Sequence, residues 1–289
     1  MSRIAYVNGS YVPFREAGVH IEDRGYQFGD GVYEVCEIRD GSLIDERRHF
    51  ERLQKSLDAL KIAAPMTQRA LAFILRETVR RNRVRDGLLY VQVTRGVARR
   101  DHMFPPAEVT PSIVVVARAL DRSKIELNAD EGIAVVTAPD IRWGRVDIKT
   151  IGLLPNVLAR QAAKERGARE AWLVDEKGLI TEGTSSNAWI VTKDGKLVTR
   201  PSSHRILTGI TRAVIKELAE REGVIFEERA FAMAEALDAR EAFITSATQG
   251  AMPVVKIDDK QIGDGRPGPV VRRLRKAFHS AAEIGPKIV

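Results

Sequence analysis

The stretch YVNGSYV, residues 6–12, contains two short runs of strand-forming residues joined by Asn8 and Gly9. Asn-Gly supplies the positive φ angles of a two-residue hairpin turn, so this stretch predicts an antiparallel hairpin. IRDGSLI (38–44) and TKDGKLV (192–198) repeat the pattern with Asp-Gly at the turn. Antiparallel sheet is therefore expected in both halves of the chain.

Helical patterns follow the first two hairpins. Apolar residues recur at helical spacing in two groups, which are Phe50, Leu53, Leu57 and Leu60, then Leu71, Ile74 or Leu75, and Val79. Strand-like runs come next, at 87–96 and 112–120. The first part of the chain is therefore predicted to be a mixed α/β domain, residues 1–118.

The segment ALDRSKIELNADEG (119–132) is polar and aperiodic, and it predicts an interdomain linker at 119–127. Beyond it, the pattern predicts strands near 133–138, 170–175, 186–192, 224–228, 241–246 and 254–258, and helices near 155–166, 209–221 and 269–281. Many short strands with few helices indicate a pseudo-barrel domain, residues 128–289. The predicted fold class is α+β, of mixed α/β type, in two domains.

The formal net charge of +7 and a pI near 9.6 raise the question of nucleic-acid binding. The densest basic run, RETVRRNRVR (76–85), contains no aromatic residue that could stack on a base, and most of its charges fall at the end of a predicted helix. This favours a solvated helix end. A basic nucleic-acid-binding protein stays as the alternative from a different class.

Composition points to a globular protein in a reducing compartment. No apolar run approaches the roughly 20 residues that cross a bilayer, and the first twelve residues lack the features of an export signal, so a cytoplasmic protein is expected. The single cysteine, Cys36, is read as a core residue on a strand. The five histidines show no metal-ligand spacing, so no metal site is predicted.

One lysine, Lys149, stands in the mostly apolar or small stretch VDIKTIGLLP (146–155). A buried amine is partly neutral and nucleophilic, as imine formation with a carbonyl compound requires. A lysine that buries its stem and extends its head to water is the simpler interpretation of the residue taken alone.

Three other stretches could accompany such an amine. ITEGTSSNAWIV (180–191) places Glu182 before a hydroxyl-rich turn that leads into an apolar strand. RILTGITRAVIKELA (205–219) begins a helix near Gly209, and ITSATQG (244–250) is small and hydroxylic; both are candidate anion sites, to which Arg52 could add a cation. An ordinary turn and N-capping by Thr208 explain the first two equally well.

The combination is more specific than its members. Pyridoxal phosphate needs a lysine for its aldehyde, a carboxylate for its ring nitrogen and helix-start amides for its phosphate. A buried lysine, a carboxylate and two anion sites meet these needs together.

The chain resembles the fold-type IV (class IV) pyridoxal-phosphate aminotransferases, and among them the bacterial D-amino acid (D-alanine) aminotransferases. The motifs that carry the resemblance, in family order, are EDRGYQFGDGVYEV (22–35), VQVTRG (91–96), DIRW (140–143), DIK (147–149), EGTSSN (182–187) and LTGITR (207–212). They cover nearly the whole chain.

The resemblance assigns the cofactor residues. Lys149 would carry the cofactor and move the proton at the substrate Cα, and Glu182 would pair with the ring nitrogen, with Arg142 behind it. The remaining cofactor contacts implied are Arg52, Asn187, Leu207, Gly209, Ile210, Thr211, Ser246, Ala247 and Thr248.

The subfamily signal is ARRDHMFP (98–105), which resembles the Arg-x-His that grips the substrate carboxylate in D-amino acid aminotransferases. Arg100 and His102, helped by Tyr33, would form this trap, and Val35 and Glu37 would line the side-chain pocket. An arginine fork suits a carboxylate, and its position decides which enantiomer presents its Cα hydrogen to Lys149.

Three residues depart from the family pattern. Glu37 replaces a lysine near the side-chain pocket, Ala247 replaces a phosphate-binding threonine, and Gly250 stands where a glutamate is usual. The first bears on the preference between acidic and neutral substrates, and the second leaves only a backbone N–H at its position.

The expected function is therefore a ping-pong transaminase that exchanges the amino group between D-alanine-like amino acids and 2-oxo acids such as 2-oxoglutarate. The resemblance also implies a homodimer, with no membrane or nucleic-acid partner. The alternatives within the family are a branched-chain L-amino acid aminotransferase, an aminodeoxychorismate lyase and an amine transaminase.

Overall fold

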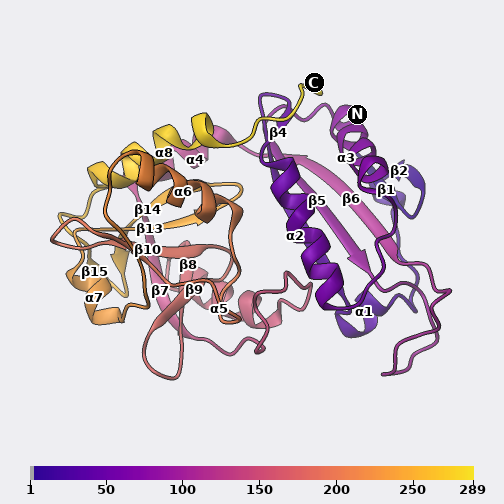
Figure 1. Cartoon of the computed structure of the whole chain (residues 1–289), viewed down its shortest axis with the longest axis horizontal. Helices are drawn as coiled ribbons and strands as arrows, with labels where there is room; N and C mark the ends of the chain where they lie inside the picture. The colour runs from indigo at the N-terminus through magenta and orange to yellow at the C-terminus, as the bar shows by residue number, and fades with distance from the viewer. Residues whose placement is uncertain (1–2) are drawn as a thin grey trace. The chain divides into compact units, whose positions relative to one another are not determined.

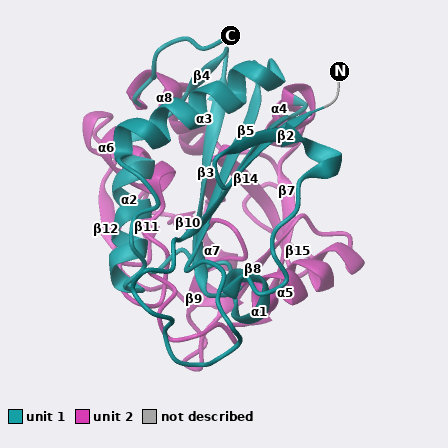
Figure 2. Cartoon of the chain, turned by 90° about the vertical axis from the view of Figure 1, so that its right-hand side faces the viewer, with its two compact units in different colours: residues 1–121, 148–152, 283–289 teal, residues 122–147, 153–282 magenta. Residues whose placement is uncertain are grey.

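The protein, described over residues 3–289 by a computed structural model, divides into two units (Figure 2). Unit 1 holds the chain up to Asp121 together with Ile148–Gly152 and Glu283–Val289, and unit 2 holds Arg122–Asp147 and Leu153–Ala282. The short segment that contains Lys149 therefore belongs to unit 1, although the chain on both sides of it belongs to unit 2.

Unit 1 is built on a six-stranded antiparallel sheet in the order β2-β1-β6-β5-β3-β4 (Figure 1). Its strands are β1 (Ile4–Val7), β2 (Ser10–Pro13), β3 (Gly31–Arg39), β4 (Ser42–Leu43), β5 (Gly87–Thr94) and β6 (Ser112–Ala119). Its helices are η1 (Phe14–Glu16), α1 (Arg24–Phe28), α2 (Glu46–Ala59) and α3 (Gln68–Asn82).

The hairpin predictions are confirmed. β1 pairs with β2 and β3 with β4, with Asn8 and Gly9 at φ 44° and 101° in the first turn and Asp40 and Gly41 at φ 48° and 78° in the second. The pairing of β10 with β11 confirms the third hairpin.

Helices α2 and α3 cover one face of this sheet, as Figure 1 shows. Their buried apolar residues are Phe50, Leu53 and Leu57 on α2, and Leu71, Ile74, Leu75 and Val79 on α3. Cys36 lies among them on β3, buried, so the prediction of a core cysteine is confirmed. Each buried aliphatic side chain contributes roughly 1.5–3 kcal/mol relative to an exposed one.

Unit 2 is built on a nine-stranded mixed sheet that forms a half-barrel, in the order β12-β11-β10-β13-β14-β7-β8-β9 with β15 beside β14. Its strands are β7 (Ile133–Pro139), β8 (Glu170–Val174), β9 (Ile180–Gly183), β10 (Asn187–Val191), β11 (Leu197–Thr199), β12 (Phe226–Glu228), β13 (Glu241–Ser246), β14 (Gly250–Ile257) and β15 (Lys260–Gln261). Its helices are α4 (Arg122–Glu131), α5 (Leu154–Glu165), α6 (Ile210–Arg221), α7 (Met233–Asp238) and α8 (Pro269–Ala281). The mixed α/β class with a barrel-like second sheet is confirmed.

Helix α4 covers most of the segment 119–127, where the sequence predicts an interdomain linker. The helix escapes a search for apolar periodicity because Ala129 is its only buried residue. The division into domains at 118 and 128 stays a prediction.

The basic run 76–85 lies at the end of α3 and just beyond it. The exposed side chains of Arg80 and Arg81 pair with Glu77 at 2.6 and 2.7 Å, so part of the positive charge is balanced within the helix. None of the helices in residues 3–289 is long and apolar enough to cross a membrane.

Candidate active site

Strand β3 carries residues of the candidate site on both of its faces. Because side chains alternate along a strand, Glu34 shares the face that α2 covers, where it is buried. Tyr33, Val35 and Glu37 share the opposite face and are half-buried. The structure therefore groups the tyrosine of the predicted trap with the two predicted pocket residues.

Glu34 anchors a buried polar cluster with two residues of α2. Arg52 donates to its carboxylate from Nε at 2.6 Å and from Nη2 at 2.8 Å, and His49 Nδ1 lies 2.7 Å from Oε2. Burial raises the pKa of Glu34, but Arg52 and His49 outweigh it and hold the pKa well below its usual range. Burial lowers the pKa of His49, and Glu34 opposes this only in part.

Lys149 lies in a short segment that runs beside β3. The Tyr33 N–H donates to the Lys149 carbonyl at 3.0 Å, the Ile151 N–H to the Gly31 carbonyl at 3.1 Å, and the Lys149 N–H to Ser56 Oγ at 3.3 Å. The backbone of Lys149 is thus held between β3 and α2. Its partner on α2, Ser56, lies one helical turn after Arg52.

The Lys149 side chain is half-buried, not buried as predicted. Its Nζ lies 4.1 Å from the centre of the Tyr33 ring, a geometry in which an aromatic face attracts an ammonium. The side chain is less buried than predicted because its segment pairs with the edge of β3 through a single bridge and does not lie inside a sheet.

Arg100 and His102 lie in an exposed loop, where both meet one aromatic ring. Arg100 Cζ lies 5.1 Å and the His102 ring 5.5 Å from the centre of Phe28. Arg24, which is buried, donates to the Asp101 carbonyl at 2.6 Å and holds the loop from beneath. The structure thus brings Arg100 and His102 together, whereas Tyr33 contacts Tyr90 and Lys149 instead.

In unit 2, Glu182 on β9 is buried and held from three directions. Asn187 Nδ2 donates to its carboxylate at 2.9 Å, the Leu207 N–H donates at 3.1 Å, and Arg142 Nη1 forms an ion pair with it. Asn187 also donates to the Leu207 carbonyl at 2.9 Å. The predicted contact between Arg142 and Glu182 is present.

Arg142 serves two carboxylates, and they titrate differently. Burial raises the pKa of Glu182 to about 7, although Arg142 opposes the effect. At Asp140, burial also raises the pKa, but two contacts with Arg142, at 2.7 and 2.9 Å, and one with Thr181, at 2.7 Å, bring it below its usual value. Arg142 keeps its charge, with its pKa raised. We interpret Asp140 as its permanent counter-ion, which leaves Glu182 able to take up a proton near neutral pH.

Helix α6 begins with Gly209 as its N-cap, and no side-chain bond caps it. The interpretation of Thr208 as an ordinary N-cap is therefore wrong. A Cβ at Gly209 would stand 2.1 Å from Asn187 Oδ1, so only glycine fits there. Ile210 and Thr211 form the buried first turn, where backbone N–H groups lack helical partners.

The ITSATQG stretch forms the tight turn between β13 and β14. Ser246 Oγ is buried and has no hydrogen-bond partner among the described residues. Ala247 and Thr248 follow it, half-buried. The departure at Gly250 has a backbone reason, since its φ is +61°, a conformation that glycine tolerates best.

Three members of these clusters, Glu34, His49 and Asp140, were not predicted as site residues. A signal was present for Glu34, because alternation along β3 places a carboxylate on the same face as Val32, Cys36 and Ile38. Asp140 stands in the quoted DIRW motif, but its pairing with Arg142 spans only two residues in a loop and has no periodic signature.

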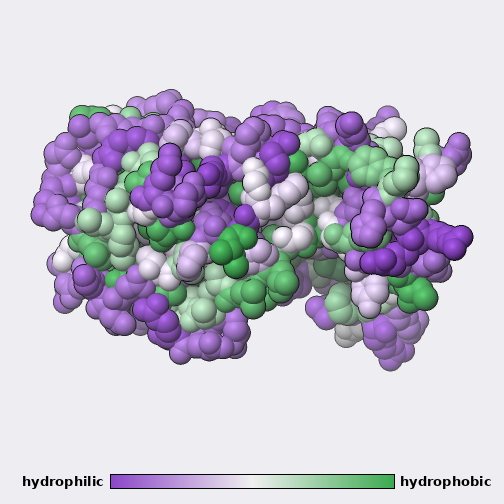
Figure 3. Space-filling view, turned by 90° about the horizontal axis from the view of Figure 1, so that it is seen from below, coloured by the Kyte–Doolittle hydropathy of each residue, from purple (hydrophilic) through white to green (hydrophobic). Residues whose placement is uncertain are grey.

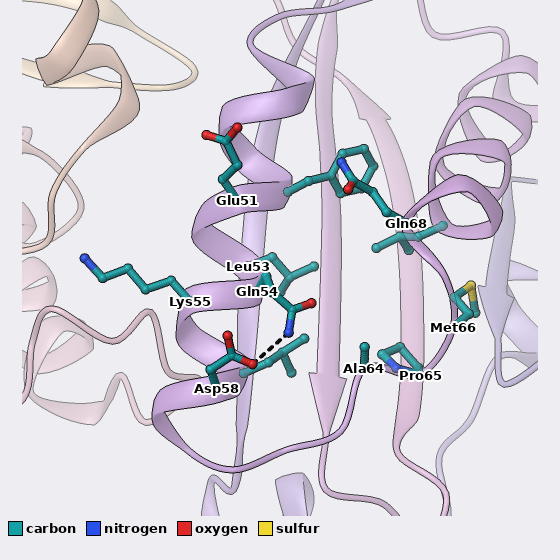
Figure 4. Close-up of a pocket in the computed structure, with 12 residues that line it drawn as sticks. Glu51, Leu53, Gln54, Lys55, Asp58, Ala64, Pro65, Met66 and Gln68 are labelled. Atoms are coloured by element: carbon teal, nitrogen blue, oxygen red, sulfur yellow. Dashed lines mark hydrogen bonds between the residues drawn. The ribbon is translucent and has the colours of Figure 1, made fainter.

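A surface groove of about 470 Å³ lies between α2 and α3 in unit 1 (Figure 4). Apolar residues, including Leu53, Leu57 and Leu71, form its floor, and Gln54 and Asp58 hydrogen-bond to each other at 2.8 Å. The groove contains none of the predicted site residues. Among residues 3–289, no group of three or more His, Cys, Asp or Glu side chains could hold a metal ion.

These elements, with the aminotransferase motifs on them, match a known class. Residues 31–257 match the family model for amino-transferase class IV, and the chain belongs to this family. It is 42% identical over 279 residues to a D-alanine aminotransferase of Staphylococcus haemolyticus, which covers 96% of this chain and 97% of that protein. It is 43% identical over 274 residues to a D-alanine aminotransferase of Bacillus licheniformis, with 95% of each covered.

Solved structures agree with the family. The branched-chain amino acid aminotransferase of Escherichia coli superposes with a TM-score of 0.87 at 25% identity, covering 97% of this chain and 94% of that one. The branched-chain amino acid aminotransferase of T.th., complexed with N-(5'-phosphopyridoxyl)-L-glutamate, gives a TM-score of 0.86 at 25% identity over the same shares. The prediction of a fold-type IV aminotransferase is confirmed.

Proposed function

We propose that this enzyme is a pyridoxal-phosphate-dependent transaminase that exchanges the amino group between D-amino acids such as D-alanine and 2-oxo acids such as 2-oxoglutarate. The observation that carries the proposal is the 42% identity, across 96% of the chain, with an enzyme named D-alanine aminotransferase. The motifs that carry the resemblance to this family are present in both units and in the family's order.

When bound, pyridoxal phosphate supplies an aldehyde that reacts with amines and a ring that accepts the electron pair released at Cα. We assign the covalent attachment to Lys149, whose backbone makes two hydrogen bonds, with Tyr33 and Ser56, while its side chain is half-buried. We assign the ring nitrogen to Glu182. A buried carboxylate with a pKa near 7 gains from a cation that replaces its lost hydration.

The phosphate would take the groups suited to an oxyanion. These are Arg52, Gly209, Ile210, Thr211, Ser246, Ala247 and Thr248, while Leu207 would pack on the ring. The orphaned, buried Ser246 Oγ is the observation that fits such a group, because a buried hydroxyl without a partner costs free energy that a phosphate oxygen would recover. Ala247 would contribute its backbone N–H alone.

Lys149 would also hold and move the substrate proton. Its amine, when it is not joined to the cofactor, would act as the base that takes the proton from the substrate Cα and holds it for return. The Tyr33 ring, whose centre lies 4.1 Å from Lys149 Nζ, would limit the positions that the amine can adopt.

We assign the substrate carboxylate to Arg100, His102 and Tyr33. Both donor and acceptor carry an α-carboxylate, so the same residues would serve both half-reactions. Fixing this group on one side of the cofactor decides which enantiomer turns its Cα hydrogen toward Lys149. Val35 and Glu37 share the face of Tyr33 and would select among substrate side chains.

We further propose that the enzyme is a cytoplasmic homodimer. Leu154, Val157 and Leu158 are exposed at helical spacing on α5, and apolar side chains of this kind favour association with a second copy. Apolar surface is visible on the face shown in Figure 3. Sedimentation equilibrium measures the oligomeric state directly.

A branched-chain L-amino acid aminotransferase is the second candidate, favoured by the TM-scores of 0.86 and 0.87. The Arg100–His102 pair argues against it, because the resemblance associates a different trap, of tyrosine and backbone amides, with those enzymes. Aminodeoxychorismate lyase and amine transaminase activities keep the same cofactor and are separated by the same assays.

A half-reaction titration tests the proposal. The visible absorbance of the bound cofactor reports its conversion. We expect D-alanine to convert it at least about 10²-fold faster than L-alanine, L-leucine or 1-phenylethylamine, which corresponds to a free-energy difference of roughly 3 kcal/mol. Adding 2-oxoglutarate should restore the original spectrum. Faster conversion by L-leucine would replace the proposal with the branched-chain activity, and a colourless protein that binds DNA would remove the enzyme class altogether.

If Arg100 binds the substrate carboxylate, its loss should raise KM more than it lowers kcat. In R100A, we expect the KM for D-alanine to rise about 10- to 100-fold, because a hydrogen bond to a charged group contributes roughly 1.5–3 kcal/mol. The fall in kcat should be smaller. The matched control is R99A, which removes an exposed arginine next in the chain. An unchanged KM in R100A, measured in the steady state, would reject this assignment.

A further inference from the structure

The carboxylate of Glu170, the first residue of β8, is one of the most deeply buried charges in unit 2, with 1% of its surface exposed. It accepts hydrogen bonds from three consecutive residues of the turn between β9 and β10. Thr184 donates from its N–H at 3.1 Å and also from its hydroxyl, Ser185 Oγ lies at 3.2 Å and Ser186 Oγ at 3.1 Å. The hydroxyls of this turn therefore point to Glu170.

Two side chains of α5 complete the attachment. Arg160 Nη1 lies 2.8 Å from the Glu170 carboxylate, and Asn156 Nδ2 donates to the Thr184 carbonyl at 2.8 Å. The packing is close, since a Cβ at Gly183 would stand 2.2 Å from Ser186 Oγ. The turn is thus fixed to β8 and α5 on its outer side.

The position of this turn decides a contact of Glu182. The turn separates Glu182 on β9 from Asn187 on β10, and Asn187 Nδ2 donates to the Glu182 carboxylate at 2.9 Å. Hydrogen bonds weaken steeply with distance and angle, so a small shift of the turn would remove this bond.

We propose that Glu170 is a positioning residue: by binding residues 184–186 it sets the Asn187–Glu182 hydrogen bond and thereby the orientation of the carboxylate that serves the cofactor ring. The inference rests on the proposed function of Glu182. Glu170 itself touches neither Glu182 nor Asn187 in the described contacts, and acts through the turn.

The variant E170Q preserves volume while it removes one acceptor oxygen and the charge. The hydroxyls of Ser185 and Ser186 then face an amide that also donates, so two bonds at Oε2 are lost or reversed. Arg160 is 42% exposed in its side chain and can turn to water. We therefore expect E170Q to fold with a looser turn.

The matched control is E241Q. Glu241 is also a buried carboxylate at the start of a strand in unit 2, where it accepts from the Val270 and Val271 N–H groups at 3.1 and 2.9 Å. It caps α8 and lies at the far end of β10 from Asn187, paired with Val191. Its loss should destabilise the fold without altering Glu182.

Hydrogen exchange of the full chain, with and without cofactor, gives a readout apart from activity. We expect exchange at residues 184–187 to be about 10-fold faster in E170Q than in the wild type, and unchanged there in E241Q. In the loaded enzyme, kcat should fall about 10-fold in E170Q with the KM for D-alanine within about 2-fold, since the substrate trap is untouched.

A double-mutant cycle with N187A separates positioning from general loosening. If Glu170 acts through Asn187, the E170Q/N187A enzyme should have a kcat within about 2-fold of N187A alone, whereas independent effects would multiply. Multiplying effects, or unchanged exchange at 184–187, would overturn the inference. The role of Glu182 is checked separately: an E182Q enzyme with wild-type kcat would reject the proposed function of that residue, whatever Glu170 does.

Discussion

Replacing Lys149 by alanine is expected to lower the rate of transamination by about 10⁴-fold, the upper end of the range for a lost general acid–base group. The variant loses the amine that would hold the cofactor and also the group that would move the proton at Cα. Unit 1 should keep its fold, because only the backbone of Lys149 hydrogen-bonds to β3 and α2. Single-turnover kinetics with D-alanine measure the loss.

The control for this variant is K55A, which removes an exposed lysine from α2 in the same unit. It should leave the rate unchanged. Borohydride reduction followed by digestion and mass spectrometry should find a pyridoxyl group on the peptide IKTIGLL (148–154) of the wild type and of K55A. A modified lysine elsewhere, or a K149A enzyme with wild-type turnover, would contradict the assignment.

The hairpins could be predicted from the sequence because each depends on a turn of two adjacent residues. The Asn-Gly and Asp-Gly turns at 8–9 and 40–41 need positive φ angles that few residues adopt, and the hairpins formed there. The small helix α7, by contrast, was not predicted, since a six-residue helix has too few turns to show a period. The same limit applies to α1, with five residues.

The return of 148–152 to unit 1 could not be predicted from the sequence. Its attachment consists of backbone hydrogen bonds to β3 and one bond to Ser56, none of which depends on a side-chain pattern in the segment itself. The prediction of a buried amine treated the apolar neighbours of Lys149 as its surroundings. Ile148 is in fact buried in the core while Lys149 is half-buried, as alternation along an extended segment requires.

The predicted site residues of unit 2 illustrate the opposite case. Glu182 and Asn187 stand five positions apart on either side of one short turn. A short sequence motif that contains both residues could therefore indicate their contact. The hydroxyls of the same turn bind Glu170 on β8, which lies 14 or more residues away in the sequence. Long-range partners of this kind depend on the order of strands in the sheet, which local patterns do not specify.

Replacing Glu182 by glutamine is expected to reduce kcat about 10²- to 10³-fold, the usual effect of losing one preorganised electrostatic contact. An amide cannot stabilise a protonated ring nitrogen as a carboxylate does. Its NH₂ group accepts no hydrogen bond, so it cannot replace either the oxygen that accepts from Asn187 and Leu207 or the one that pairs with Arg142. E182D keeps the charge and should recover part of the rate. The control E176Q removes an exposed carboxylate of the same unit and should have no effect.

The same variant should change how the stability of the cofactor-free protein depends on pH. The folded-state pKa of Glu182, about 7, lies above its ordinary value of 4.5, so the folded chain binds a proton that the unfolded chain has released. Stability is therefore fully present below pH 4.5 and falls as pH rises through 7, by about 3 kcal/mol for a shift of this size. Because the amide of E182Q does not titrate, urea unfolding between about pH 4.5 and 8 should show a decline smaller by that amount. If both proteins lost stability in parallel, Glu182 would already be ionised throughout this range. Its carboxylate would then be an ordinary structural partner of Arg142, and the assignment to the ring nitrogen would lose its electrostatic basis.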